Sequence, residues 1–155
     1  MNTLPCTFVQ KGAKMHFLSR ILLTVLLGGA VFTDLRAGRI YNAWLVLWTV
    51  PGALIRLAGE GLSALPILLF LTISTFLVLF PFYCRGGLGA GDIKLLMAVS
   101  VFLSPAEYAS CLSAILLLSA LYAGIVLVLT KDLRRGLHLA LPIAAGVLLH
   151  VGGVY

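Results

Sequence analysis

Two aspartates, Asp34 and Asp92, stand where strongly apolar stretches of the sequence end or begin. Asp34 closes one such stretch and precedes a short basic segment, whereas Asp92 opens another and follows the glycine-rich residues 85–91. Two carboxyl groups that share a site cannot both ionise at low cost, so one keeps its proton while the other is anionic. Such a pair supplies an acid and a base for one reaction. Because the two groups titrate as a coupled unit, neither role is assigned to one residue.

The apolar stretches around these aspartates predict membrane helices. Apolar residues make up 61% of the chain and charged residues only 10%, whereas soluble domains contain about 25% charged residues. Residues 61–84 and 108–130 carry no formal charge, and each range exceeds the roughly 20 residues that a helix needs to cross the hydrocarbon. Six hydrophobic segments are predicted, over residues 17–34, 40–57, 62–83, 91–104, 106–130 and 137–153. We therefore expect an all-α fold, a polytopic membrane bundle of about six transmembrane segments, formed by a single domain over residues 17–155.

Lysine and arginine in the loops predict the orientation of this bundle. They are more frequent in loops 34–40, 84–94 and 131–136 than on the opposite side, and loops rich in these residues stay in the cytoplasm. With this topology, Asp34 and Asp92 lie at the same membrane depth on the cytoplasmic face, and both termini lie outside.

The other three acids do not form a pair of this kind. Asp132 lies among basic residues in the solvated loop 131–136, and Glu60 and Glu107 fall on the opposite side of the predicted bundle. Only Asp34 and Asp92 therefore stand at helix boundaries where two carboxyl groups can converge.

Residues 1–16 form a separate N-terminal segment in this interpretation. Lys11 and Lys14 within it oppose the predicted orientation. A translation start at Met15 would remove the conflict, and a cleaved signal peptide ending near residues 28–30 is the alternative.

Charge and spacing argue against nucleic-acid, metal and phosphate sites. The net charge of +6 is spread through short loops, as membrane topology requires, so no nucleic-acid partner is expected. The three cysteines have no CxxC spacing and the three histidines are isolated, so neither a metal nor another cofactor is expected. Residues 91–94 read Gly-Asp-Ile-Lys where a phosphate-binding loop would need Gly-Lys-Ser/Thr.

The glycine run before Asp92 favours a functional interpretation over a purely structural one. An aspartate at a helix start can simply be an N-cap that accepts the first free amides, and Asp34 can simply flank a helix end. A cap does not require the four glycines within residues 86–91, which imply special backbone conformations or close approaches. We expect Asp92 to occupy the N-cap position. Lys94, two residues further on, should point away from it towards the membrane interface.

These residues resemble two motifs of the type IV prepilin peptidases, which are intramembrane aspartic proteases. The segment "GGLGAGDIKLL" contains a GxGD pattern at residues 89–92 and is similar to the second catalytic motif of that family. The segment "TDLRAGRIYNAW" follows the order of the first motif, with Asp34, Arg36, Arg39, Ile40 and Asn42. Tyr41 stands where the family usually has proline, and "LALPIAAGVLL", with Pro142, is similar to the family's last helix. The resemblance covers most of residues 20–153.

The resemblance implies a hydrolase, an aspartic-type endopeptidase that needs no cofactor. Its site residues would be the catalytic Asp34 and Asp92, with the substrate approach formed by Gly89, Ala90, Gly91 and Lys94. The implied substrates are prepilins or pseudopilins, whose basic leader lies in the cytoplasm and whose apolar helix enters the bilayer. The protein would lie in the inner (plasma) membrane with its site facing the cytoplasm.

Among these peptidases, the chain is similar to the short, peptidase-only branch found with Flp/Tad-type pilus systems, and an archaeal preflagellin peptidase is a related alternative. Two non-enzymatic functions stay open: a proton-coupled carrier that uses both aspartates, and an inactive pilus-assembly factor. Carriers usually hold such acids near the membrane midplane, in repeated scaffolds, whereas these acids lie at the boundary. The sequence neither predicts nor excludes a homo-oligomer.

Overall fold

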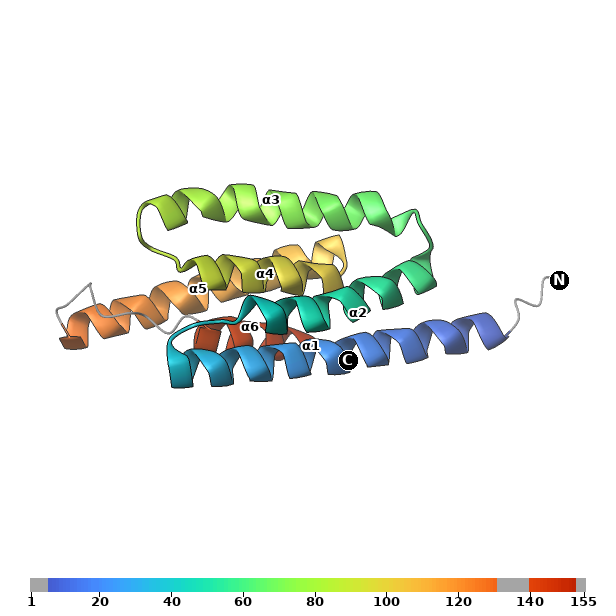
Figure 1. The fold of residues 1–155 in the computed structure, drawn as a ribbon, viewed down its shortest axis with the longest axis horizontal. Coiled ribbons are helices and arrows are strands. Elements are labelled where there is room, and N and C mark those ends of the chain that lie inside the picture. Colours follow the sequence, from blue (N-terminus) through green and yellow to red (C-terminus); the bar gives the residue numbers. More distant parts are fainter. Residues whose placement is uncertain (1–5, 131–139, 153–155) are drawn as a thin grey trace.

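The computed structural model describes residues 6–130 and 140–152 and consists there of helices joined by short loops. The helices are α1 (Cys6–Ala37), α2 (Asn42–Glu60), α3 (Ala64–Cys84), α4 (Ala90–Phe102), α5 (Pro105–Thr130) and α6 (Ala140–Gly152). Figure 1 shows them lying side by side along the long axis of the molecule. No strand occurs in the described residues, so the predicted all-α bundle is confirmed, with its helices in the predicted order.

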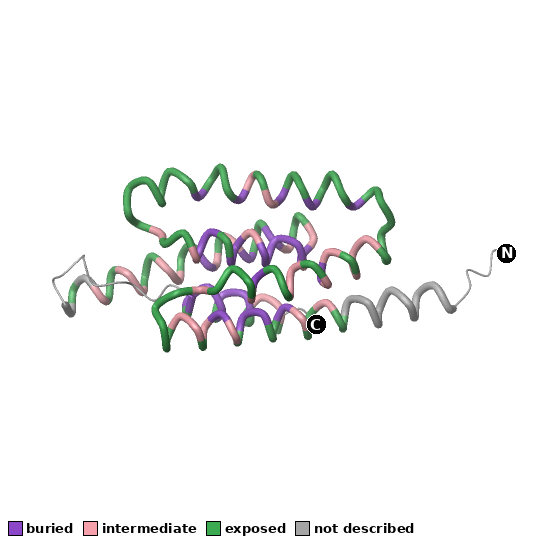
Figure 2. The backbone as a smooth tube through the Cα atoms, in the orientation of Figure 1, coloured by how far each residue is buried: buried purple, intermediate pink, exposed green. Residues whose placement is uncertain are grey.

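The short helix α4 forms the centre of the bundle. It contacts each of the other five helices, most extensively α3 and α2. Its buried residues are nearly consecutive from Asp92 to Val101, which means that neighbours cover α4 on almost every side. Figure 2 shows this burial along α4, while α3 is exposed over most of its length. A central helix of 13 residues spans only about 20 Å, shorter than the roughly 30 Å hydrocarbon layer.

The outer helices carry the apolar surface expected of a membrane protein. Phe70 on α3 is 70% exposed and Leu117 on α5 is 67% exposed, and large apolar patches of this kind mark contact with lipid or another protein. Three helical ranges are long and apolar enough to cross a membrane: Phe17–Ala37, Ala64–Cys84 and Pro105–Val126. The chain is therefore a helical membrane protein in which long outer helices surround the shorter α4.

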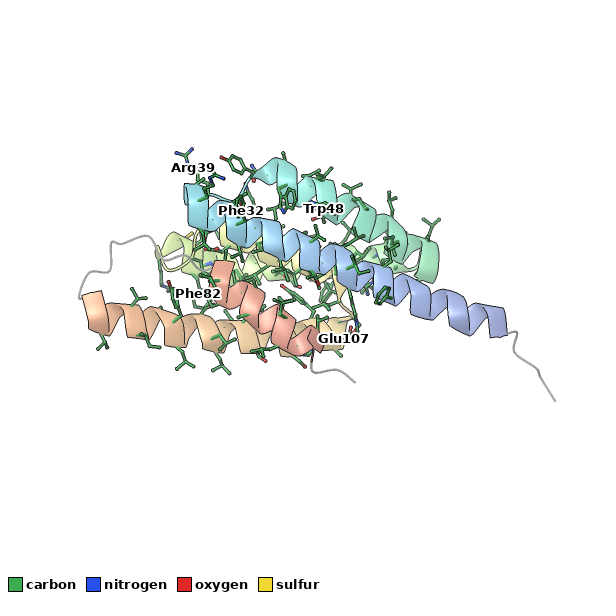
Figure 3. The ribbon with its side chains drawn as sticks, turned by 90° about the horizontal axis from the view of Figure 1, so that it is seen from below. Phe32, Arg39, Trp48, Phe82 and Glu107 are labelled. Atoms are coloured by element: carbon green, nitrogen blue, oxygen red, sulfur yellow. The ribbon has the colours of Figure 1, made fainter. Side chains whose placement is uncertain are left out.

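Alternating helix directions place two of the predicted cytoplasmic loops at one end of the bundle. The α1–α2 and α3–α4 connections lie together, and α5 ends on the same side (Figure 1). In a view from below, Arg39 and Phe82 lie near this end, whereas Glu107 lies near the other (Figure 3). We call the end with the α1–α2 and α3–α4 connections the loop end. The third predicted loop, residues 131–136, lies outside the described residues.

Several helix boundaries differ from those predicted. α1 begins at Cys6 instead of residue 17 and extends beyond its neighbours (Figure 1), because residues 6–16 contain no proline that would interrupt it. α6 covers Ala140–Gly152, within the predicted range 137–153. Its Pro142 falls in the first turn, where a missing backbone N–H breaks no intrahelical bond.

Candidate active site

Asp34 lies in the last turn of α1, at the loop end. The helix terminates after Ala37 because Gly38 adopts a left-handed backbone with φ 60° and donates its N–H to the Asp34 carbonyl at 2.8 Å. Glycine is the residue that ends helices in this way, since it carries no Cβ to clash. The Asp34 side chain is half-buried, so it is held near the bundle surface where α1 turns towards α2.

Tyr41 is the last residue of the α1–α2 connection and has an extended backbone. Tyr41 is the N-cap of α2, with φ −75° and ψ 125°, and its carbonyl accepts the N–H of Trp44 at 3.1 Å. This φ lies within the range that a proline ring imposes. A proline, which is usual at this position in the family that the sequence resembles, would therefore fit the backbone conformation of Tyr41.

Trp44 fixes the start of α2 against α1. Its indole nitrogen donates to the Leu26 carbonyl at 3.1 Å, and its ring lies over Gly29, where any side chain would overlap it. Small residues allow helices to approach this closely. The packing holds the first turn of α2 in a fixed position relative to the helix that carries Asp34.

Asp92 is buried at the start of α4, with a relative exposure of only 7%. The N-cap residue is Gly89, and Asp92 is the third residue of the helix, so the expected N-cap position of Asp92 is wrong. Its carboxylate Oδ2 accepts the N–H of Gly89 at 3.2 Å, as an acid at the third helical position does when it reaches back to the cap residue. The same burial and contact hold the carboxyl group at the loop end.

Two glycines before Asp92 meet specific geometric demands. Gly86 has φ 76°, a left-handed conformation that residues with a side chain rarely adopt. A Cβ on Gly89 would lie 2.9 Å from Oδ2 of Asp92, closer than carbon and oxygen tolerate, so the carboxylate occupies the space that a side chain would need. Gly87 is less constrained, since the nearest atom to its would-be Cβ is the Phe82 carbonyl at 3.5 Å.

The two motifs meet at the loop end through two separate contacts. A Cβ on Gly91 would touch the Ile40 side chain at 3.4 Å, so α4 begins against the α1–α2 connection. The Lys94 ammonium donates to Oδ1 of Asn42 at 3.1 Å and joins the first turns of α4 and α2. The predicted course of Lys94 towards the membrane interface stays a prediction, and at the start of α2 its ammonium finds an acceptor in Asn42.

These contacts bring Asp34 and Asp92 within electrostatic range of each other. One carboxyl group is buried and the other half-buried, so the two groups of the pair stand in different environments. The arrangement therefore allows one group to act as an acid and the other as a base on a molecule held between them. The described residues contain no cluster of three His, Cys, Asp or Glu side chains that could hold a metal ion.

The site residues predicted from the sequence thus lie together at the loop end. There Gly89 contacts Asp92, Gly91 contacts the connection that follows Asp34, and Lys94 bonds to the first residue of α2. Ala90 is exposed as the first residue of α4. Asn42 and Ile40 also belong to this site, although their residue types alone predicted no role for them. Their position after Asp34 in the first motif was the available signal, because it places them beside whatever the second motif contributes.

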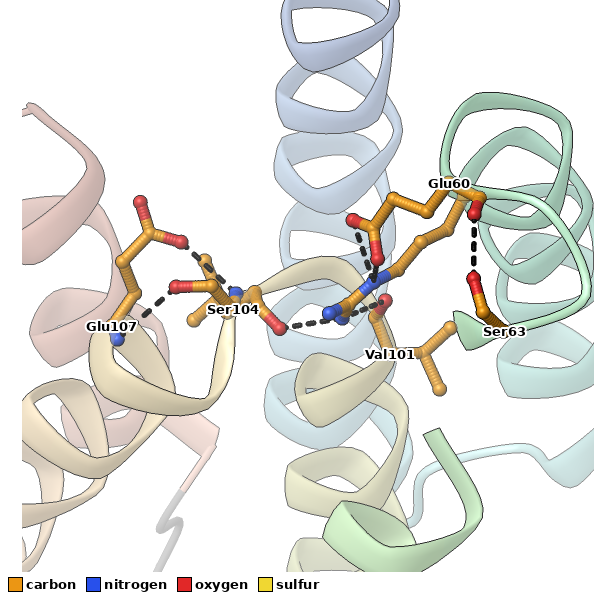
Figure 4. A network of polar contacts seen from close by, with 7 residues as sticks. Glu60, Ser63, Val101, Ser104 and Glu107 are labelled. Carbon is orange, nitrogen blue, oxygen red and sulfur yellow. Dashed lines mark hydrogen bonds and ion pairs between the residues drawn. The ribbon is translucent and has the colours of Figure 1, made fainter. Parts of the chain in front are cut away.

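The other described acids lie at the opposite end, in a network of structural contacts (Figure 4). Glu60 pairs with Arg56 at 3.2 Å. Glu107 accepts the N–H of Ser104 at 2.9 Å and caps α5. Asp132 lies outside the described residues. Of the acids that the structure describes, only Asp34 and Asp92 are therefore available for chemistry at the loop end.

The sequence matches one known protein family. The model of a family described as the type IV leader peptidase family matches residues 21–129, a range that contains both aspartates and both motifs. No curated protein and no solved structure matches the chain.

Proposed function

The chain belongs to the type IV leader peptidase family, and we propose that it is an aspartic endopeptidase that removes the leader peptide of prepilins or pseudopilins. Membership implies a peptidase of the membrane. One observation above all supports the aspartic mechanism. Asp34 and Asp92 belong to helices far apart in the sequence, yet both lie at the loop end of the bundle. Two contacts, Gly91–Ile40 and Lys94–Asn42, join their motifs there.

The chemistry follows from two carboxyl groups in different environments. The anionic group takes a proton from a water molecule as that water attacks the scissile carbonyl carbon. The protonated group donates a hydrogen bond to the carbonyl oxygen, which gains negative charge as the tetrahedral intermediate forms. When the intermediate collapses, a proton passes to the leaving amine and the peptide bond breaks. Because the pair shares its protons, neither aspartate is assigned a fixed role.

The position of the pair favours a substrate that meets the membrane at its boundary. Both aspartates stand at helix termini, and Gly89 and the exposed Ala90 leave the backbone at the start of α4 without a large side chain. An extended peptide segment can therefore lie close to Asp92. A prepilin has such a segment between its basic leader and its apolar helix. The basic residues in loops 34–40 and 84–94 support a cytoplasmic orientation for this end. The membrane we propose is the inner membrane.

The test is cleavage by the purified full chain in detergent. Candidate prepilins with intact leaders are incubated with the protein, and the N-terminus of each product is sequenced. We expect a single new N-terminus at the junction between the basic leader and the apolar helix. The same pilins without leaders serve as the control and should stay unchanged. Failure to cleave any prepilin, with folded protein present, would contradict the proposed function.

A further inference from the structure

A groove runs along the bundle between α2 and α4, with one residue of α3, Thr72, at its edge. Figure 1 shows α4 between α2 and α3, and α2 and α3 contact each other only slightly. The groove has a volume of about 410 Å³ and opens on the outer surface of the bundle. Its lining comprises Asn42, Leu45, Val46, Thr49, Val50, Thr72, Lys94, Met97, Ala98 and Val101.

The lining residues follow the helical repeat on both sides. Those of α2 recur three to four residues apart from Asn42 to Val50, and those of α4 recur in the same way from Lys94 to Val101. Each stripe occupies one face of its helix. Eight residues rise about 12 Å along a helix axis, a little over two turns. The groove is thus a trough roughly two turns long, bounded by two helices that run in the same direction from the loop end (Figure 1).

The groove has a polar end and an apolar remainder. Asn42 and Lys94 form the polar end, and they are the same two residues that join the motifs carrying the aspartates. Beyond them, aliphatic side chains dominate, with the small Ala98 on the α4 side. Small residues at such positions allow another helix to approach closely. The groove therefore begins at the first turns of α2 and α4, two residues from Asp92 along α4, and opens along its length to the outer surface of the bundle.

We propose that this groove seats the first two turns of the substrate's apolar helix, immediately beyond the cleaved bond. The inference rests on the proposed function and names the surface that recognises the substrate. A helix lying parallel to α2 and α4 would begin at Asn42 and Lys94, so the peptide segment before it would pass the aspartates. Aliphatic or aromatic side chains on one face of that helix would fill the trough, and this burial would hold the scissile bond in place.

Lys94 also has hydrogen-bond donors that could hold the substrate backbone at the polar end of the groove. An ammonium group has three N–H donors, and the hydrogen bond to Asn42 uses one of them. The others can bind a backbone carbonyl in the extended segment between leader and helix, where the peptide has no internal hydrogen bonds. Reacting groups must be held about 3–3.5 Å apart for efficient reaction, and anchoring on both sides of the bond meets that demand.

Neighbouring residues on α2 provide a matched test. Val46 and Val50 line the groove and are 60% and 51% exposed, while Leu47 and Leu54 are 59% and 60% exposed on the same helix but do not line it. Val46→Trp and Val50→Trp should fill the trough and raise KM for prepilin cleavage at least about tenfold, with a smaller change in kcat, since they remove binding shared by ground and transition states. Leu47→Trp and Leu54→Trp should stay near wild type. Equal effects of the two pairs, at equal membrane abundance, overturn the inference.

Photo-crosslinking identifies the occupant directly and does not depend on turnover. A benzophenone side chain is placed at position 46 or 47 of the full-length Asp92→Asn chain, which is mixed with a prepilin that has its leader and helix. We expect adducts from position 46 to the first two helical turns of the prepilin, and few from position 47. Adducts to lipid alone, or equal adducts from both positions, overturn the groove as a substrate site.

If the wild-type chain cleaves prepilin while the groove variants behave like their controls, the groove inference fails and the proposed function stands. If it cleaves none, the proposed function itself fails.

Discussion

Lys94 of α4 donates a hydrogen bond to the side chain of Asn42 on α2 over 3.1 Å, and so connects the first turns of these two helices. Neither residue is an acid of the candidate pair. The bond lies beside the Gly91–Ile40 contact, and together they determine how the α1–α2 connection sits against the start of α4. The spacing between the two aspartates therefore depends on residues outside the pair.

Breaking this bond should slow cleavage without unfolding the protein. We expect Asn42→Ala to lower kcat/KM by about fivefold, which corresponds to the ~1 kcal/mol net contribution typical of one hydrogen bond. Lys94→Met should lower it by more, because it also removes the donors proposed to hold the substrate. If Asn42 acts only through Lys94, the double variant should lose little more than Lys94→Met alone. Additive losses in this double-mutant cycle would show that Lys94 and Asn42 act separately. Arg39→Met, an exposed cation of the same end, is the control.

Gly89 should be far more sensitive to substitution than Gly87. In Gly89→Ala, the new methyl group would lie 2.9 Å from Oδ2 of Asp92 and push the carboxylate aside. Displacement of a reacting group by about 1 Å costs on the order of 100-fold in rate, and relief of this contact needs only part of that displacement, so we expect kcat to fall by about tenfold. Gly87→Ala has its nearest neighbour at 3.5 Å and should keep most of its activity. The comparison is made by initial rates of prepilin cleavage, and similar rates for both variants would disprove the proposed crowding of Asp92.

Much of this arrangement could be predicted from the sequence, and the failures have identifiable causes. Uncharged apolar runs fix the helices, and their alternating direction places Asp34 and Asp92 at one end. The pairing of Lys94 with Asn42 depends on how α2 packs against α4, a relationship between residues 52 positions apart that local periodicity does not contain. The helix position of Asp92 depends on the extended backbone of Gly89, and helix ends are the least predictable feature of a pattern.

Arg56 should stabilise the bundle at the end opposite the aspartates. Its side chain is only 10% exposed, and it donates from Nη1 to the carbonyl of Leu103 at 2.6 Å and to that of Val101 at 3.3 Å. These carbonyls lie at the end of α4, where the helix itself provides no donors. Arg56→Met should lower the free energy of unfolding by ~1–3 kcal/mol, because it leaves them unpaired. Thermal unfolding in detergent measures this loss as a lower Tm.

Glu60→Gln tests whether the ion pair or the carbonyl contacts provide that stability. Glu60 is 48% exposed, and exposed ion pairs contribute below about 1 kcal/mol. The Tm of Glu60→Gln should therefore stay close to that of the wild type. Glu60→Gln and Arg56→Met should both still cleave prepilin at temperatures where they are folded. A Tm loss for Glu60→Gln equal to that of Arg56→Met would assign the stability to the ion pair instead.

The two loops at the loop end should be accessible from the same side of the membrane. Single cysteines introduced as Arg39→Cys or Gly87→Cys in a chain without its native cysteines should both react with an impermeant maleimide in inside-out vesicles. A cysteine introduced as Leu62→Cys, in the α2–α3 connection, should react only from the opposite side. Labelling of positions 39 and 87 from different sides would make a shared site impossible, since the aspartates would then be separated by the bilayer.

The aspartate pair itself should fail as a unit. Asp34→Asn and Asp92→Asn keep the shape of each side chain but remove its ability to hold a negative charge or exchange a proton. Either change should abolish prepilin cleavage, and the double variant should be no worse than the singles, because groups that act together lose their effect with the first deletion. Glu60→Gln at the far end is the control for removing an acid.

Asp92→Glu keeps the charge but moves it by one methylene, and a dyad requires placement within roughly 0.5 Å, so this variant should also be inactive. Near-normal turnover by Asp92→Glu would mean that Asp92 supplies only local charge, and substantial activity in Asp34→Asn would reduce Asp34 to the polar end of a helix.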